Sequence, residues 1–149
     1  MTKAVRVTKR FTFETAHALQ CHDGLCASIH GHSYVLDVTL RGVPRTAPMH
    51  PKDGMVVDFA DLKRVVKEAV VDGYDHMLLL HEADTASRPA GAAAMVRVRL
   101  TPWQPTCENM LLDIVRTLRG AMPEGMELVQ VRLQETATSW AEWCASDEA

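Results

Sequence analysis

The chain has 149 residues, of which 47% are hydrophobic and 23% are charged, and this balance predicts one folded domain with its own hydrophobic core. A net charge of −3 argues against a general nucleic-acid or membrane-surface binder. The N-terminus carries no apolar run typical of a signal peptide, and no stretch is long enough to cross a bilayer. We therefore expect a cytoplasmic protein, with neither nucleic acid nor membrane as a partner, whose four cysteines are reduced.

Two segments of alternating hydrophobicity come first in the chain. Residues 5–15 alternate β-branched or aromatic residues with polar ones, which predicts a strand whose face continues to His17. Residues 30–42 alternate again, with His30 and His32 on the face shared with the apolar positions. Consecutive strands usually pair antiparallel, so His17 at the end of the first strand is expected near the two histidines at the start of the second.

Two helices are predicted after these strands. Asp58 is a typical N-cap, and apolar residues recur at helical spacing from there until Gly73. Thr106 is the expected N-cap of the second helix, which has its own apolar stripe. Residues 81–104 between them predict a long loop rich in Ala, Gly and Pro, with a short strand at 95–100.

The last third of the chain predicts two more strands. Residues 126–136 alternate and place Glu135 on one face with Val129 and Leu133, and residues 139–144 form the final candidate strand. The resulting order of two strands, two helices and two strands predicts an α+β fold. Its four-stranded antiparallel sheet would carry both helices on one face.

Three histidines in this arrangement predict a metal site. His30 and His32 are two residues apart, so a strand places both on one face, and His17 would join them from the neighbouring strand. Three imidazole ligands leave one coordination position open, which is typical of catalytic zinc, although iron, nickel or copper fit the same ligands. A closed structural site made of Cys21, Cys26, His30 and His32 is an alternative that leaves His17 unexplained.

Other side chains near this motif could move protons or bind a ligand. Positive charge from a metal would favour the thiolate of Cys26, which suits a base. Asp75 could fix the tautomer of the adjacent His76, although a charge pair at a helix end also explains the two. Glu135 is either a solvent-facing residue at a sheet edge or a half-buried acceptor that needs donors, such as ring N–H and NH2 groups. The helix dipole accounts for Glu108.

Taken in order, these pieces resemble one known family, the 6-pyruvoyltetrahydropterin synthase / 6-carboxytetrahydropterin synthase family. The resemblance covers about residues 5–143. Its motifs are Phe13-x-x-Ala16-His17, Cys26-x-x-x-His30-Gly31-His32-Ser33-Tyr34, Val57-Asp58-Phe59-x-x-Leu62-Lys63, Asp75-His76, Pro105-Thr106-x-Glu108-Asn109 and Glu135-Thr136. The three-residue gap between Cys26 and His30 is more similar to the 6-carboxytetrahydropterin synthase branch, which makes a precursor of queuosine.

The resemblance implies a tunnelling fold. One such domain would span residues 1–149, with a loop insertion around 81–104. Subunits would assemble into an oligomeric β-barrel, as a homohexamer of two stacked trimers, with active sites between subunits. By position, His17, His30 and His32 would hold zinc.

The resemblance also implies roles for the remaining site residues. Cys26, Asp75 and His76 would form the group that transfers protons. The residues expected around the pterin ring of the substrate are Glu135, Thr106 and Glu108.

The activity implied is that of a zinc-dependent lyase. It would convert 7,8-dihydroneopterin triphosphate to 6-carboxy-5,6,7,8-tetrahydropterin and release acetaldehyde and triphosphate. The nearest alternative keeps the fold and the substrate but makes 6-pyruvoyltetrahydropterin. More distant alternatives are a zinc-dependent hydrolase and a structural zinc protein.

Overall fold

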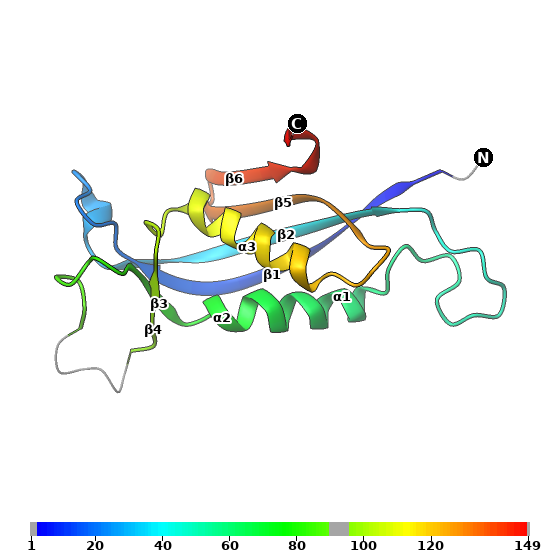
Figure 1. Ribbon diagram of the computed structural model, residues 1–149, viewed down its shortest axis with the longest axis horizontal. Coiled ribbons are helices and arrows are strands. Elements are labelled where there is room, and N and C mark those ends of the chain that lie inside the picture. Colours follow the sequence, from blue (N-terminus) through cyan, green and yellow to red (C-terminus); the bar gives the residue numbers. More distant parts are fainter. Residues whose placement is uncertain (1–2, 90–95, 149) are drawn as a thin grey trace.

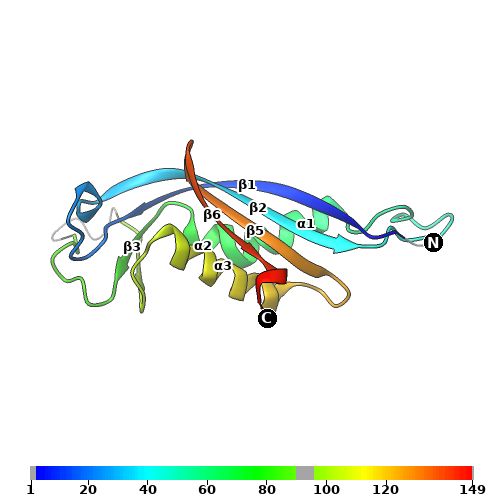
Figure 2. The ribbon, with the colours of Figure 1, turned by 90° about the horizontal axis from the view of Figure 1, so that it is seen from above.

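A computed structural model describes residues 3–89 and 96–148 of the chain. It consists of one curved six-stranded sheet, in the order β4-β3-β1-β2-β5-β6, with the helices on one face (Figures 1 and 2). The strands are β1 (Val5–His17), β2 (His30–Gly42), β3 (Met77–His81), β4 (Val98–Thr101), β5 (Glu127–Thr136) and β6 (Ser139–Cys144). No helix within the described ranges is both long enough and apolar enough to span a bilayer.

Both predicted helices form where their N-caps were expected. The Asp58 side chain accepts the N–H of Ala60 at 2.8 Å, and that of Thr106 accepts the N–H of Asn109 at 3.3 Å. The helices are α1 (Phe59–Val66), α2 (Asp72–Tyr74) and α3 (Cys107–Ala121), with a π-helical turn at Lys67–Val71 joining the first two. Short 3-10 turns occupy Leu25–Ala27 and Ala145–Asp147.

The sheet differs from the predicted four-stranded antiparallel one, because it has six strands and is mixed. Strands β1, β2, β5 and β6 pair antiparallel as predicted, whereas β3 and β4 extend the β1 side in parallel. The alternation pattern missed β3 because residues 77–80 are continuously apolar, as in strands buried on both faces. The short strand predicted at 95–100 is found at Val98–Thr101, and Met95 lies outside the described residues.

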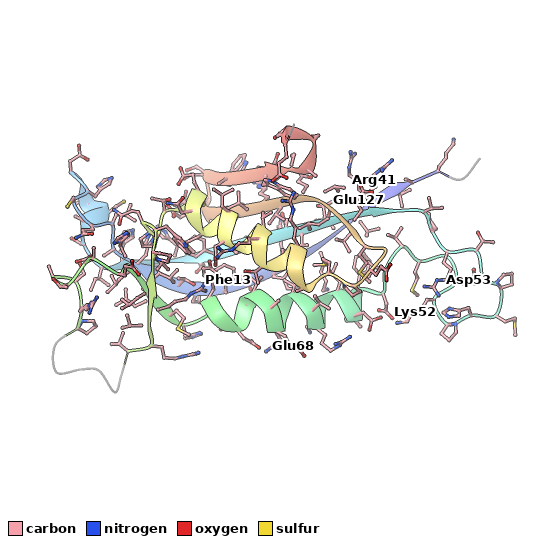
Figure 3. The ribbon with its side chains drawn as sticks, in the orientation of Figure 1. Phe13, Arg41, Lys52, Asp53, Glu68 and Glu127 are labelled. Carbon is pink, nitrogen blue, oxygen red and sulfur yellow. The ribbon has the colours of Figure 1, made fainter. Side chains whose placement is uncertain are left out.

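The hydrophobic core lies between the sheet and the helices. Phe13 points from β1 toward the helices in Figure 3 and stacks on Tyr34 of β2, with ring centroids 5.5 Å apart. Leu62 of α1 and Ile114 of α3 are buried in the same cluster. This packing fixes the inward face of β1 and β2, and the three histidines lie on that face.

A register shift between β2 and β5 corrects the predicted face of one residue. The pairing is irregular between Thr39 and Leu40, and across this irregularity Leu128 is buried while Val129 is only half-buried. The alternation had placed Val129 on the buried face. Beyond the shift Leu133 points inward as expected.

Candidate active site

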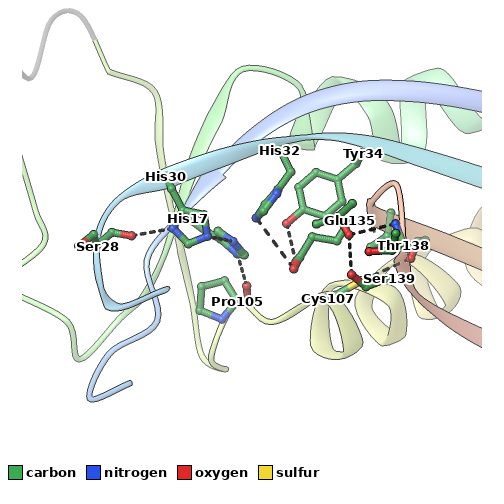
Figure 4. A network of polar contacts seen from close by, with 12 residues as sticks. His17, Ser28, His30, His32, Tyr34, Pro105, Cys107, Glu135, Thr138 and Ser139 are labelled. Carbon is green, nitrogen blue, oxygen red and sulfur yellow. Dashed lines mark hydrogen bonds and ion pairs between the residues drawn. The ribbon is translucent and has the colours of Figure 1, made fainter. Parts of the chain in front are cut away.

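Strand register brings the three histidines together. His17 is paired with His30 across β1 and β2, and His32 is paired with Thr15, whose side chain points the same way as that of His17. One ligand nitrogen from each ring lies within 4.8 Å of the others (Figure 4). The predicted proximity of the end of β1 and the start of β2 is confirmed.

Hydrogen bonds set the tautomers of two of these rings. Nδ1 of His17 lies 2.7 Å from the carbonyl oxygen of Pro105, and Nδ1 of His30 lies 2.7 Å from that of Ser28. A carbonyl only accepts, so both Nδ1 atoms carry the proton and both Nε2 atoms have free lone pairs. These Nε2 atoms are 3.1 Å apart. Burial lowers the pKa of His17, which keeps its ring neutral.

The histidine group fits a metal ion. Two Nε2 lone pairs that face each other repel, and a cation between them turns this repulsion into ligation. The buried Nε2 of His32 also has no hydrogen-bond partner among the described residues. Neutral imidazoles oriented through Nδ1 are the donor set that zinc, copper, iron and nickel accept.

The alternative closed site does not form in the described part of the chain. Neither Cys21 nor Cys26 belongs to the group of ligand atoms around the histidines. Cys21 is exposed, with a positive φ of 61°. The cluster that could hold a metal therefore consists of three imidazoles and no thiol.

Glu135 lies next to the histidine group at the end of β5. Its Oε2 accepts a hydrogen bond from the hydroxyl of buried Tyr34 at 3.1 Å, and its Oε1 is 3.9 Å from Nε2 of His32 (Figure 4). Burial and this carboxylate raise the pKa of Tyr34, so the phenol keeps its proton and donates. Oε1 forms no hydrogen bond with the described residues. Glu135 can therefore accept hydrogen bonds from a ligand with two neighbouring N–H groups.

A pocket of about 330 Å³ is lined by His17 and Glu135, and this volume is in the range of small-molecule sites. Its walls come from the loop after β1, the start of α3 and the β5–β6 hairpin. The predicted site residues that line it are His17, Cys26, Thr106, Glu108 and Glu135. These five residues are the ones predicted for metal binding, proton transfer and ring binding, and the fold brings them to one cavity.

The chain matches, over residues 6–145, the family described as 6-pyruvoyl tetrahydropterin synthase. It belongs to the 6-pyruvoyl tetrahydropterin synthase family. It is 32% identical over 143 residues to the 6-carboxy-5,6,7,8-tetrahydropterin synthase of Haemophilus influenzae, covering 93% of this chain and 97% of that protein. It is 37% identical over 123 residues to a probable 6-carboxy-5,6,7,8-tetrahydropterin synthase of Halobacterium salinarum, covering 80% of this chain and 73% of that protein.

Solved structures agree on the fold of this 6-pyruvoyl tetrahydropterin synthase family member. The 6-pyruvoyl tetrahydropterin synthase of Plasmodium falciparum matches with a TM-score of 0.72 at 20% identity, covering 94% of this chain and 96% of that one. The enzyme of Caenorhabditis elegans matches with a TM-score of 0.69 at 24% identity, covering 97% of both chains.

In this family member, Asp75 and His76 lie apart from the pocket that holds Cys26. They sit at the outer edge of β1, where the Asp75 carboxylate accepts the N–H of Glu14 at 2.9 Å and lies 3.0 Å from Nδ1 of His76. The Glu14 N–H and the His76 ring lower the pKa of Asp75. His76 lines a second cavity of about 320 Å³ with His32, and neither Cys26 nor Glu135 lines it.

Several residues that line the cavity with Cys26 were not predicted from the sequence. Cys107 lies directly after the predicted cap Thr106, and burial and the Glu135 carboxylate raise the pKa of its thiol to about 12. Cys107 therefore stays protonated and forms an apolar part of the wall. The other missed lining residues are Leu19, His22, Ser139, Trp140 and Ala141. Their proximity to the predicted residues in sequence was the only available signal.

Proposed function

We propose that this protein is a zinc-dependent lyase that converts 7,8-dihydroneopterin triphosphate and water to 6-carboxy-5,6,7,8-tetrahydropterin, acetaldehyde and triphosphate. The observation that carries this proposal is the cavity lined by Cys26, Glu135 and His17, which is one member of the histidine group. The names of the relatives from Haemophilus influenzae and Halobacterium salinarum support the carboxy product.

The three imidazoles are the proposed zinc ligands. His17, His30 and His32 would hold the ion through Nε2 atoms whose partner nitrogens, in the first two rings, already donate to backbone carbonyls. Bound there, zinc would supply Lewis acidity toward the hydroxyls of the substrate side chain and make the neighbouring C–H more acidic.

Glu135 is the proposed anchor of the pterin ring. Tyr34 holds one of its oxygens, which orients the carboxylate, and the other oxygen can accept from the ring N–H and the exocyclic NH2. Thr106 and Glu108 line the wall beside it at the start of α3. Because Oε1 of Glu135 lies 3.9 Å from Nε2 of His32, a ring bound at Glu135 would hold the substrate side chain beside the metal ligands.

Cys26 is the proposed group that removes a proton from a side-chain carbon. It is half-buried in the 3-10 turn of the loop that follows β1, and it lines the same cavity as His17. Asp75 and His76 are the proposed relay for protons on oxygen, since the carboxylate contacts Nδ1 and leaves Nε2 free for exchange.

The open edges of the sheet support assembly of several copies into a homo-oligomer. β3 contacts β1 only between Thr15 and His17, so residues 5–14 of β1 have no strand on that side within the described ranges. β6 is the opposite edge. The antiparallel alternation from β1 to β6 would continue if β6 of one subunit paired with β1 of the next.

A row of charges favours one register for this pairing. Arg10 faces Asp37, Asp37 faces Arg132, and Arg132 faces Glu142 across the four strands, so the charges alternate in sign from one edge to the other. Arg10 binds Asp37 with two hydrogen bonds of 2.8 and 3.0 Å. Opposite charges on facing strands attract, so Glu142 of the partner subunit would continue the row beside Arg10.

That register would also complete the active site. With Glu142 of the partner subunit opposite Arg10, antiparallel pairing places Trp140 of the partner subunit opposite Thr12. The hairpin wall of one cavity would then lie beside Glu14, whose backbone binds the Asp75–His76 pair. A hexamer of two stacked trimers with sites between subunits fits this geometry.

One experiment tests the proposed reaction. Zinc-loaded protein is incubated with 7,8-dihydroneopterin triphosphate, and products are identified by mass spectrometry with a separate assay for acetaldehyde. We expect acetaldehyde and the 6-carboxy product in equal amounts. A 6-pyruvoyl product without acetaldehyde would favour the second candidate, which a 31% identical match over 86 residues to the 6-pyruvoyl tetrahydrobiopterin synthase of Dictyostelium discoideum supports.

A further inference from the structure

The buried carboxylate of Asp113 binds Tyr74, the residue before the Asp75–His76 pair, and has no role in the proposed reaction. The side chain of Asp113 on α3 is only 4% exposed. Its Oδ2 accepts the Tyr74 hydroxyl at 2.6 Å and Nη2 of Arg99 at 2.9 Å, while its Oδ1 accepts Nη2 of Arg116. Burying a charge costs free energy even when it is paired, and apolar packing would fill the same space at lower cost. The cluster is therefore a candidate for fixing geometry.

Arg99 connects this carboxylate to the two residues that precede Asp75. Its guanidinium carbon lies 4.6 Å from the centroid of the Tyr74 ring, and its Nη1 donates to the carbonyl of Gly73 at 3.3 Å. Arg99 belongs to β4, which lies in the segment between β3 and α3. Through Arg99, this segment makes two contacts with the end of α2, and Asp113 of α3 makes a third.

The chain directly after Tyr74 needs such support. The Tyr74 carbonyl accepts the Thr15 hydroxyl at 2.7 Å, and the next peptide leaves the helical conformation at Asp75. His76 then adopts a left-handed φ of 58°, which is costly for a residue with a side chain. Such a conformation persists only where the surrounding contacts impose it.

We propose that Arg99 and Asp113 are positioning residues for the Asp75–His76 pair and act on it through Tyr74. The proposal rests on the proposed function, in which this pair relays protons. Asp113 and Arg99 hold the Tyr74 ring and the Gly73 carbonyl, and these fix where the chain turns out of α2. The turn sets the distance of 3.0 Å between the Asp75 carboxylate and Nδ1 of His76.

The first test compares Arg99→Met with the matched control Arg116→Met. Both remove a cation from the same carboxylate, but Arg116 is 76% exposed on its side chain, and its recorded polar contact is with Asp113. We expect Arg99→Met to lower kcat about tenfold with KM within about twofold, and Arg116→Met to change neither by more than about twofold. Arg99→Lys, which keeps the charge without the planar fork, should recover part of the loss.

A second readout does not depend on activity. The pKa of the Asp75 carboxyl, now lowered by the Glu14 N–H and by His76, is followed by carbon-13 NMR. Arg99→Met should raise it toward the ordinary value, and Arg116→Met should leave it in place. If the wild type fails to turn over the pterin substrate, the proposed function fails and this titration still decides the positioning role.

Tyr74→Phe covers the case in which Arg99→Met does not fold. It removes only the hydroxyl that binds Asp113, and we expect the same two changes at smaller size. Equal behaviour of Arg99→Met and Arg116→Met in both readouts would overturn the proposal. So would a loss of melting temperature in Arg99→Met or Tyr74→Phe with kcat and the Asp75 pKa unchanged.

Discussion

The two cavities beside the histidines are built in different ways. The cavity with Cys26 and Glu135 has walls from three parts of the chain and includes the buried ring of His17. The cavity with His76 lies at the outer edge of β1, and the His76 side chain is 73% exposed. The first combines one proposed metal ligand with the proposed anchor, whereas the second presents the ring of His76 outward. This difference fits the proposed site shared between two subunits.

The largest effect is expected from the histidine group. His32→Ala removes a ligand nitrogen that has no other partner in the described residues, so bound zinc and at least about 10³-fold of the activity should be lost. Bound zinc is measured by mass spectrometry of the protein, and activity is measured as turnover of the substrate. His50→Ala, in the loop near Lys52, is the matched control and should keep both. Retention of stoichiometric zinc in His32→Ala would remove the histidine group as the metal site.

Cys26→Ala tests proton removal in the cavity that Cys26 shares with Glu135. The change should lower kcat about 10³-fold because it removes the proposed carbon base, while zinc stays bound. Cys21→Ala, an exposed neighbour in the same loop, should behave as the wild type. Near-normal turnover in Cys26→Ala would instead fit a hydrolase that uses water as the nucleophile.

The comparison between the two cavities is sharpest in mixed oligomers. Cys26→Ala and His76→Ala should each be nearly inactive alone. If each site takes Cys26 from one subunit and His76 from its neighbour, co-expression of the two should restore about a quarter of the sites. Cys26→Ala mixed with Glu135→Gln should restore none, because these residues line one cavity of one subunit. No recovery in the first mixture would place both functions in the same subunit.

The smallest effect is expected from Tyr34, which binds the proposed anchor Glu135. Tyr34→Phe removes the hydroxyl that holds one oxygen of Glu135 and leaves the aromatic packing on Phe13. A single hydrogen bond to a charged group corresponds to about 1.5–3 kcal/mol, so KM for the pterin should rise about tenfold or more with kcat less affected. Steady-state kinetics measure this, and an unchanged KM would show that the orientation of Glu135 does not depend on Tyr34.

The features of this site that depend on residues close in sequence or on consecutive strands could be predicted from the sequence. The side-chain period of two in a strand predicted that His30 and His32 share a face, and antiparallel pairing predicted that His17 joins them. The N-caps Asp58 and Thr106 were found because capping is a contact between residues close in sequence.

The parts that were missed depend on contacts distant in sequence. The parallel strand β3 is continuously apolar and shows no alternation, so only its pairing with β1 and β4 reveals it. The inward turn of Leu128 instead of Val129 depends on a bulge opposite Thr39 and Leu40. The separation of His76 from Cys26 depends on which edge of β1 receives the end of α2.

The long open edge of β1 affects the solubility of the single chain. Residues 5–14 expose a row of backbone donors and acceptors to any passing strand, and such edges seed misassembly and aggregation. Lys9 and Arg10 on this edge are the kind of charged side chains that discourage wrong partners. If the proposed pairing with another copy forms, the chain is most prone to misassembly before that copy covers this strand, and slow or weak association would be detected first as insoluble protein.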